Sequence, residues 1–375
     1  MLDPRYERLG ELVVAYSLDL REGELLRIDA PLVAAPLVAG LYRGALRRGA
    51  NAYVNSEVPG LVELLLKSGS EEQLTYISPV QQREIELIDA LATIWSDSNT
   101  RSLTAADPER HQRYIASRRA LTNRYWERIG AGEARWCGTL SPTHAHAQDA
   151  EMSLAEYEDF VFGACHVLEG QDAVGHWRSV SETLGARARE LASVRELRIV
   201  GRDTDLRLLV EGRTWIAADG KFNLPDGEVF TSPVEEGAEG EIRFSFPAIF
   251  HGHAVDDVRL RFEGGRVVAA EATRGGDYLN ALLDMDGESR YLGECAFGLN
   301  YEIDRFTRNI LFDEKIGGTV HIALGAGFPQ AGGKNRSALH WDLICDLRED
   351  GEVYADGELV WKAGGFLREP AVEHV

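Results

Sequence analysis

The last third of the chain carries side chains of the kind that bind divalent metal ions. They lie in short strand-like or glycine-rich segments, at Glu294, Glu314, His321, His340 and Asp342. Imidazole and carboxylate groups that converge can neutralise a divalent ion and replace its hydration shell. The sequence therefore predicts a metal centre within residues 294–342.

The triplet His340-Trp341-Asp342 indicates how two of these side chains are presented. Successive side chains of a strand point to opposite faces, so His340 and Asp342 would share one face while Trp341 takes the other. A histidine and an aspartate two positions apart in a strand have few purely structural uses. Glu294 lies among apolar residues, where an unpaired carboxylate would be costly to bury.

Length and composition place the chain among ordinary globular proteins. With 375 residues it is long for one core, so we expect two domains. The 44% hydrophobic and 27% charged content is unremarkable. Four scattered cysteines without a CxxC pair fit reduced thiols and predict a cytoplasmic protein.

The charge and the apolar runs exclude some partners. A formal charge of −21 would repel nucleic-acid phosphates, so no nucleic-acid partner is expected. No apolar run reaches the ~18–20 residues that span a bilayer, so no membrane partner is expected. Residues 1–5 lack the basic and then apolar pattern of a secretory signal.

The first half alternates strand and helix patterns. Strands are predicted at 24–29, 51–55 and 92–95, with helices at 32–48 and 61–67 between them. This βαβ order favours a mainly parallel sheet covered by helices. Neither GxGxxG after the first strand nor GxxxxGK[ST] is present, so the layout is a Rossmann-like scaffold without a nucleotide fingerprint.

The predicted elements change from mixed helices and strands to mostly strands near residue 195. A capping box, Ser153 with Glu156, opens a helix to about residue 168, and a second helix follows at 172–191. Two strands within 196–210, a hairpin at 258–270 and a short helix at 277–283 come next. The expected fold is α/β: an N-terminal βαβ Rossmann-like domain over 1–195, then an α+β, strand-rich metal-binding catalytic domain over 196–375.

Five segments in the second domain carry a family resemblance. They are NLPDGEVFTSP at 223–233, YLGE at 291–294, LFDE at 311–314, GGTVHIALG at 317–325 and HWD at 340–342. In this order they closely resemble the aminopeptidase T family of metallo-aminopeptidases, which includes the bacterial enzymes AmpS and PepS. The resemblance extends to residues 135–140 and 148–162. One segment alone would be a weak signal, but five in order are a strong one.

The resemblance implies a dimeric exopeptidase that uses two divalent ions, zinc, cobalt or manganese, to release N-terminal residues from peptides. Glu294 would bridge both ions, and Glu314 would contact the metal site and could move protons. The other implied metal ligands are Glu228, His321, His340 and Asp342.

This set suits hydrolysis. Two ions ~3.5–4 Å apart can share an activated water and polarise the scissile carbonyl. One of them can also anchor the free α-amine of a peptide. A general base must take the proton of the water and deliver it to the leaving amine. Glu314 is the first candidate for that catalytic role, and Glu294 is the second.

The chain departs from the family pattern at one position. Many relatives have a tyrosine seven residues after the first histidine ligand, where this chain has Phe328. A phenol there could donate a hydrogen bond to the oxyanion, and losing one such donor typically costs ~10²–10³ in rate. Either the metals alone supply this stabilisation, or another donor substitutes, or the protein is a weak peptidase or does other chemistry.

Two alternatives stay open on the sequence. A mononuclear non-haem iron enzyme, resembling ring-opening dioxygenases that act on dihydroxypyridines, would need only one metal's ligands and a pair such as His340 and Asp342. A protein with this scaffold and little or no peptidase activity is the other. The pairs His144/His146 and His251/His253 also have metal-ligand spacing, but without an acidic cluster beside them we expect surface residues in a loop and a turn.

Overall fold

The computed structural model describes residues 3–250 and 252–371. Residues 1–2, 251 and 372–375 lie outside this range. Two compact units make up the chain: residues 1–176 with 220–225, and residues 177–219 with 226–375. The division of the chain into two domains near residue 195 stays a prediction.

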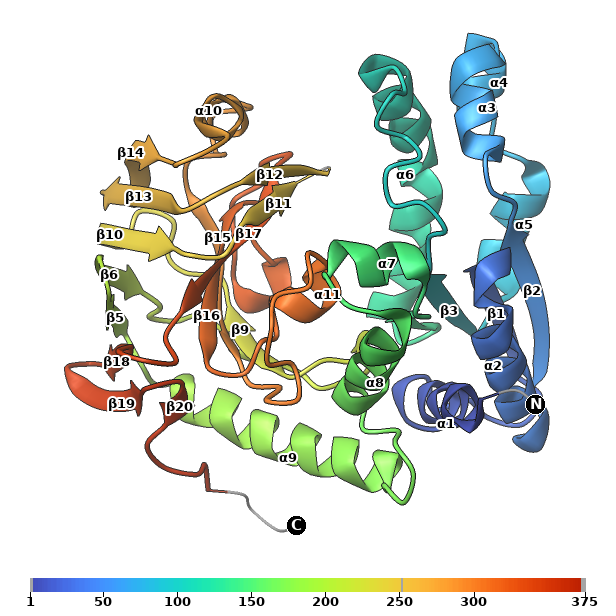
Figure 1. The fold of residues 1–375 in the computed structure, drawn as a ribbon, viewed down its shortest axis with the longest axis horizontal. Helices are drawn as coiled ribbons and strands as arrows, with labels where there is room; N and C mark the ends of the chain where they lie inside the picture. The colour runs from blue at the N-terminus through green and yellow to red at the C-terminus, as the bar shows by residue number, and fades with distance from the viewer. Residues whose placement is uncertain (1–2, 251, 372–375) are drawn as a thin grey trace. The chain divides into compact units, whose positions relative to one another are not determined.

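The first unit combines helices with a parallel sheet (Figure 1). Its helices are α1 (Pro4–Leu12), α2 (Ala35–Arg47), α3 (Leu61–Ser68), α4 (Glu71–Thr75), α5 (Pro79–Leu87), α6 (Pro108–Gly130), α7 (His144–Asp149) and α8 (Leu154–Ala164), with a π-helical turn at Val13–Ser17 and a 3-10 turn at Leu32–Ala34. Its strands are β1 (Leu25–Pro31), β2 (Asn51–Glu57), β3 (Ala90–Trp95), β4 (Arg135–Leu140) and β8 (Asn223–Leu224).

The strands of this unit form one sheet in the order β2-β1-β3-β4-β8, and every neighbouring pair is parallel. The parallel sheet, the three strands and the helices α2 and α3 predicted from the βαβ pattern are therefore confirmed. The capping box that opens α8 is also confirmed, because the Ser153 hydroxyl accepts from the backbone N–H of Glu156 while the Glu156 carboxylate accepts from the N–H of Ser153.

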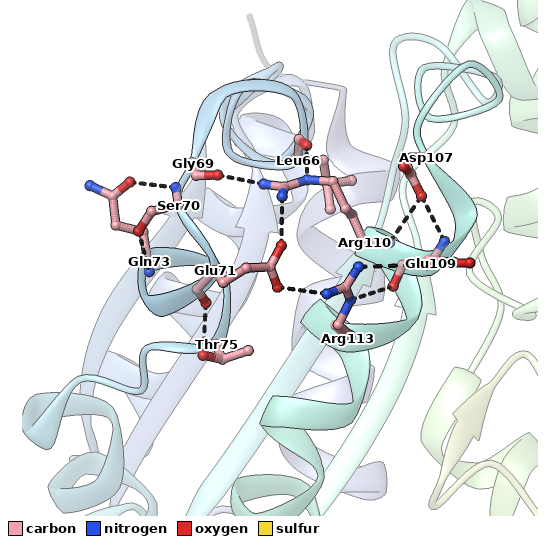
Figure 2. Close-up of polar contacts among 10 residues, drawn as sticks. All are labelled: Leu66, Gly69, Ser70, Glu71, Gln73, Thr75, Asp107, Glu109, Arg110 and Arg113. Carbon is pink, nitrogen blue, oxygen red and sulfur yellow. Dashed lines mark hydrogen bonds and ion pairs between the residues drawn. The ribbon is translucent and has the colours of Figure 1, made fainter.

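The long helix α6 was not among the predicted elements, and it holds the segment between α3 and α4. Figure 2 shows Arg110 of α6 reaching this segment, where its guanidinium donates to the carbonyl oxygens of Leu66 (2.6 Å) and Gly69 (2.5 Å). The carboxylate of Glu71 forms ion pairs with Arg110 at 2.8 Å and with Arg113 at 2.9 Å. Arg110 thereby satisfies carbonyls that the end of a helix leaves without intrahelical partners.

The second unit is rich in strands. It contains α9 (Ala173–Leu191, which begins in the first unit), α10 (Gly276–Leu283), α11 (Ile310–Asp313) and a 3-10 turn at Pro329–Ala331. Its strands are β5 (Glu196–Gly201), β6 (Thr204–Leu209), β7 (Ile216–Ala218), β9 (Glu228–Thr231), β10 (Ala238–Phe244), β11 (Ala248–Phe250), β12 (His253–Val255), β13 (Val258–Glu263), β14 (Arg266–Glu271), β15 (Leu292–Gly298), β16 (Thr319–Gly325), β17 (His340–Asp346), β18 (Glu352–Ala355), β19 (Glu358–Lys362) and β20 (Gly365–Phe366).

Two antiparallel sheets share one apolar core. The eight-stranded sheet runs β14-β13-β10-β6-β5-β18-β19-β20, and the five-stranded sheet runs β17-β16-β15-β9-β7 (Figure 1). Side chains from both sheets form one cluster, among them Leu206, Leu260, Phe297 and Trp341. The predicted strand pair β5/β6, the hairpin β13/β14 and the helix α10 are confirmed. The fold as a whole is mixed α/β, as predicted.

Candidate metal centre

Strand pairing places five of the six predicted ligand residues on one face of the five-stranded sheet, while Glu314 follows α11 instead. Ala323 of β16 lies opposite Glu294 on one side and opposite Asp342 on the other. Directly opposed residues point to the same face, so the two carboxylates stand in one row across three strands. The alanine between them leaves room for both.

The two histidines follow from the same register. His321 is two residues before Ala323 on β16, and His340 of β17 lies opposite Gly325, two residues after it. Both therefore point to the face that carries the carboxylates. Trp341 points the other way into the apolar core, where it is 2% exposed, so the predicted alternation along 340–342 is confirmed.

Glu228 joins the face from a fourth segment. It begins β9 and lies opposite Gly298 of β15, which is four residues after Glu294 and so on the same face. Gly227 precedes it with φ of 123°, a conformation that side chains disfavour. A Cβ on Gly227 would also come within 2.8 Å of Asn300, so glycine is required where the chain turns into β9.

A second close approach shapes the start of β15. A Cβ on Gly293 would stand 2.0 Å from the carbonyl oxygen of Ala326. Only glycine lets these two backbones meet, and the register of β15 against β16 shifts at this point. Glu294 follows directly, so the bulge sets the position from which its carboxylate projects.

Glu294 is the centre of the cluster. Its Oε1 lies 3.6 Å from Nε2 of His321, and its Oε2 lies 3.5 Å from Nε2 of His340. Asp342 Oδ1 is 3.5 Å from Nε2 of His340 and 3.9 Å from Nε2 of His321. One ligand-type atom from each of Glu294, His340 and Asp342 lies within 4.8 Å of the other two.

Backbone carbonyls fix the orientation of both imidazoles. Nδ1 of His321 is 2.9 Å from the carbonyl oxygen of Glu314, and Nδ1 of His340 is 2.8 Å from that of Ala326. A carbonyl oxygen can only accept, so each Nδ1 carries the proton. In the neutral ring Nε2 then presents its lone pair to the carboxylates, which is how a metal-binding histidine is held.

The charges of the cluster shift its pKa values strongly. Burial acts to lower the pKa of His321, but Glu294, Glu228 and Asp342 outweigh it and raise that pKa to about 10. The pKa of His340 is raised to about 12 against the same burial effect, chiefly by Asp342 and Glu294.

The carboxylates show the complementary effect. Burial acts to raise the pKa of Asp342, but His340 above all, with His321 and Lys315, lowers it to about 2. Glu294, 4% exposed, likewise has its pKa lowered because the histidines outweigh burial. The cluster thus contains ionised carboxylates whose negative charge is balanced by protonated imidazoles.

A second group of charges lies beside Glu228. The ammonium of Lys315 contacts Oε1 of Glu314 and lies 3.7 Å from Oε1 of Glu228 and 3.8 Å from Oδ1 of Asp226. Burial raises the pKa of both Glu228 and Glu314, although Lys315 acts against it. The carboxylates keep the pKa of Lys315 above its ordinary value in spite of its burial.

The two neighbouring acids at the end of α11 have different surroundings. Asp313 accepts from the backbone N–H (2.6 Å) and hydroxyl (2.8 Å) of Thr307, and burial raises its pKa to about 8. It therefore orders the loop before α11. Glu314, the next residue, makes the contact with Lys315, so the predicted acid is the one of the pair that joins the cluster.

The donor set fits a divalent cation. Among residues 3–250 and 252–371, Oε2 of Glu228 and Oδ1 of Asp342 are buried without a hydrogen-bond partner. Unpaired buried carboxylate oxygens are costly. Oδ1 of Asp342 lies 3.5 Å from Nε2 of His340, the ring nitrogen that can bind a metal, so a cation between them would satisfy this oxygen. Oε2 of Glu228 lies 3.7 Å from Nδ1 of His321, which donates to the carbonyl oxygen of Glu314.

Phe328 lies beside this cluster, as the sequence comparison anticipated. Its ring is 5.4 Å from that of His340 and 5.1 Å from that of Phe230, measured between centroids. Its backbone N–H donates to the Ser232 hydroxyl at 2.9 Å. An apolar ring therefore stands against one of the predicted ligands.

The histidine pairs set aside in the sequence are located elsewhere. His144 is exposed, but His146 is 8% exposed, and both lie on α7, so the expectation of a surface loop was wrong for this pair. Nε2 of His146 accepts from the backbone N–H of Asp97 at 3.1 Å. His253 packs its ring against Tyr278 at 4.6 Å, while His251 lies outside the described residues.

Sequence reasoning missed Lys315 and Asp226. Asp226 lies two residues before Glu228, and Lys315 directly follows Glu314. A lysine beside an acidic pair is usually solvated, and lysines are almost never fully buried unless paired. The clustering of Asp226 and Glu228 in one turn was the available signal, but only the fold brings Lys315 to it.

Comparison with known proteins identifies the family of the chain. Residues 2–366 match the family of thermophilic metalloproteases, M29. The chain is 27% identical to aminopeptidase 2 of Geobacillus stearothermophilus (97% of this chain, 98% of that one) and 25% identical to aminopeptidase AmpS of Bacillus subtilis (93% and 94%). The solved structure of wild-type AmpT from Thermus thermophilus superposes with a TM-score of 0.84 at 25% identity, over 97% of this chain and 99% of that one. The match over nearly the whole length shows that this chain belongs to the M29 family of thermophilic metalloproteases.

Proposed function

We propose that this protein is a metal-dependent aminopeptidase, a hydrolase that cleaves the N-terminal peptide bond of peptides. Family membership and the aminopeptidases that match along almost the whole chain support this function. The observation that carries it is the cluster around Glu294, whose two oxygens face two imidazoles held as metal ligands by backbone carbonyls.

Two divalent ions, zinc, cobalt or manganese, would be held by this chain. Because Oε1 of Glu294 faces His321 and Oε2 faces His340, its carboxylate is suited to bridge two ions. Hard carboxylate and borderline imidazole ligands accept several metals, so the donor set alone does not select one. The residues that would hold the ions are Glu228, Glu294, Glu314, His321, His340 and Asp342.

The bound ions would supply Lewis-acid polarisation and lower the pKa of a bound water. Glu314 is the first candidate to take up and release the proton, with Glu294 as the second. Burial raises the pKa of Glu314, which brings this carboxyl closer to the range in which a general base can also act as an acid. Lys315 holds one oxygen of Glu314 and thereby fixes its direction.

The decisive experiment is metal analysis of purified protein combined with a matched pair of substrates. We expect two zinc, cobalt or manganese ions per chain and hydrolysis of a dipeptide such as Leu-Gly. N-acetyl-Leu-Gly, which lacks the free amine, should not be cleaved. Cleavage of both peptides alike, or of neither, contradicts an aminopeptidase.

The same experiment distinguishes between the two alternative functions that the sequence left open. One iron per chain with turnover of a dihydroxypyridine would support the ring-opening dioxygenase. Metal binding without cleavage of any dipeptide or aminoacyl-anilide would support a protein that keeps the scaffold with little or no activity. The family and its named relatives favour the peptidase.

Three further expectations belong to this proposal: a Rossmann-like scaffold, a cytoplasmic location and a homodimer. The parallel order β2-β1-β3-β4-β8 supports a Rossmann-like scaffold for the first unit. The four cysteines, all within the described residues, are free thiols, which supports a cytoplasmic location. In those residues no helix has the length and apolar character needed to cross a membrane. A homodimer is implied by the family resemblance, and light scattering of the purified protein tests it.

A further inference from the structure

Lys315 is the most unusual charged residue that the sequence reasoning missed. Its side chain is 0% exposed, and its ammonium faces Glu314, Glu228 and Asp226. The backbone on either side is anchored: its N–H donates to the carbonyl of Phe312 at 2.9 Å, and its carbonyl accepts from the N–H of Asn300 at 3.2 Å. The amine is therefore a fixed feature of the site.

The lysine and the ligand cluster share the same carboxylates. Oε1 of Glu228 lies 3.7 Å from the Lys315 ammonium, while Oε2 lies 3.7 Å from Nδ1 of His321. One oxygen of Glu314 contacts Lys315 directly. An ammonium and a metal ion repel one another and draw on the same carboxylates, so they compete for these two residues.

The other half of the cluster lies farther from this ammonium. Among the described residues Lys315 makes ion pairs within 4 Å with Glu314, Glu228 and Asp226, whereas its charge acts on Asp342 only from a longer distance. Glu294, His340 and Asp342 bring three ligand atoms within 4.8 Å of one another. The charged partners of Glu294 in the structure are imidazoles, which give up their protons when a metal binds. A lysine beside carboxylates keeps its charge. The two halves of the centre thus differ in built-in positive charge.

We propose that Lys315 is a positioning residue that acts as a fixed internal cation: it holds Glu228 and Glu314 in place when no metal is bound, and it weakens metal binding on their side relative to the Glu294–His340–Asp342 side. This inference rests on the ligand assignment of the proposed function. It makes the Glu228 and Glu314 side the second to load and the first to release its ion.

The test compares the full-length protein with Lys315→Met, which keeps the length of the side chain and removes its charge. Lys334→Met is the control, because it removes an exposed lysine from the same unit. Stepwise Zn²⁺ affinity is measured by competition with a chelating dye. Thermal unfolding is recorded in chelator and in excess Zn²⁺.

We expect Lys315→Met to tighten the weaker Zn²⁺ step by about tenfold or more, because one repelling charge is gone. It should unfold at a lower temperature than wild type in chelator and regain most of that loss in Zn²⁺. Lys334→Met should match wild type in both. An unchanged or weaker second step, or equal destabilisation with and without Zn²⁺, would make Lys315 a purely structural lysine and overturn the proposal.

A second variant covers the case in which Lys315→Met does not fold. Lys315→Gln can still donate hydrogen bonds to Glu314 but carries no charge, and it can be purified with Zn²⁺ present and then challenged with the dye. It should retain Zn²⁺ more strongly than wild type, and wild-type release would contradict the proposal. If wild type itself binds no metal, the proposed function fails; if wild type binds two ions and both variants release them as wild type does, only the role of Lys315 fails.

Discussion

The imidazole of His340 lies edge-to-face against the ring of Phe328, with the two centroids 5.4 Å apart and the planes at 76°. This packing orients the more exposed of the two histidines, since the side chain of His340 is 34% exposed and that of His321 is 1% exposed. It also places an apolar ring where the family resemblance leads us to expect a phenol.

Phe328→Tyr is therefore expected to raise peptidase turnover. A hydroxyl added to this ring could donate to a developing oxyanion, and the gain should be about tenfold if the donor is well aligned. Steady-state rates on a dipeptide, with metal content measured in parallel, check this. Phe230→Tyr, on the other ring that packs against Phe328, is the control. Unchanged turnover with intact metal would mean that no donor is missing at this position.

Glu294→Gln should remove metal and activity together. The amide keeps the size of the side chain but loses the charge that faces both histidines. The loss of metal affinity should exceed the roughly 10–100-fold that is typical for an outer-shell partner. Metal content per chain and dipeptide hydrolysis are the measurements, and the exposed Glu358→Gln on β19 is the matched control. A variant that keeps two ions and the original rate would show that Glu294 is not a ligand.

Metal-free protein should lose stability as the pH rises from about 6.5 towards 10. The folded pKa values of His321, about 10, and His340, about 12, lie above the unfolded value near 6.5. Their contribution is therefore complete below pH 6.5 and falls as the pH approaches the folded pKa. Unfolding temperatures in chelator between pH 6 and 9.5 measure it, and His340→Gln should reduce the slope.

The metal-loaded protein should behave in the opposite way over the same range. Each histidine must give up its proton to bind a metal, so metal affinity rises with pH. Added Zn²⁺ should stabilise more at pH 8 than at pH 6. Parallel pH profiles with and without metal would contradict the assignment of His321 and His340 as ligands.

Arg110→Met should loosen the segment between α3 and α4. Its guanidinium donates to the carbonyls of Leu66 and Gly69, and leaving such acceptors unpaired costs about 1–3 kcal/mol. Arg113→Met breaks exposed ion pairs with Glu71 and Glu109 and an exposed hydrogen bond to the backbone carbonyl of Glu109, and it should cost about 1 kcal/mol or less. Hydrogen exchange of residues 61–75 compares the two, and equal protection in both variants would rule out the helix-end contacts as the reason.

Local patterns in the sequence determined parts of both units and of the site. The alternation at 340–342 placed His340 and Asp342 on one face because side chains of a strand alternate by geometry alone. The capping box at Ser153 and the hairpin β13/β14 formed as predicted because their signals act over a few residues. The family resemblance added Glu228, 66 positions before Glu294.

Only the tertiary structure decided which neighbours these residues have. The register of β9, β15, β16 and β17 brings Glu228 and Glu294 onto the face of His321, and it leaves alanine or glycine at the positions between. The carbonyls that fix the imidazoles belong to Glu314 and Ala326, and the burial of Lys315 depends on Asp226 and Glu228 across the fold. These contacts join segments that are distant along the chain, so no local pattern encodes them.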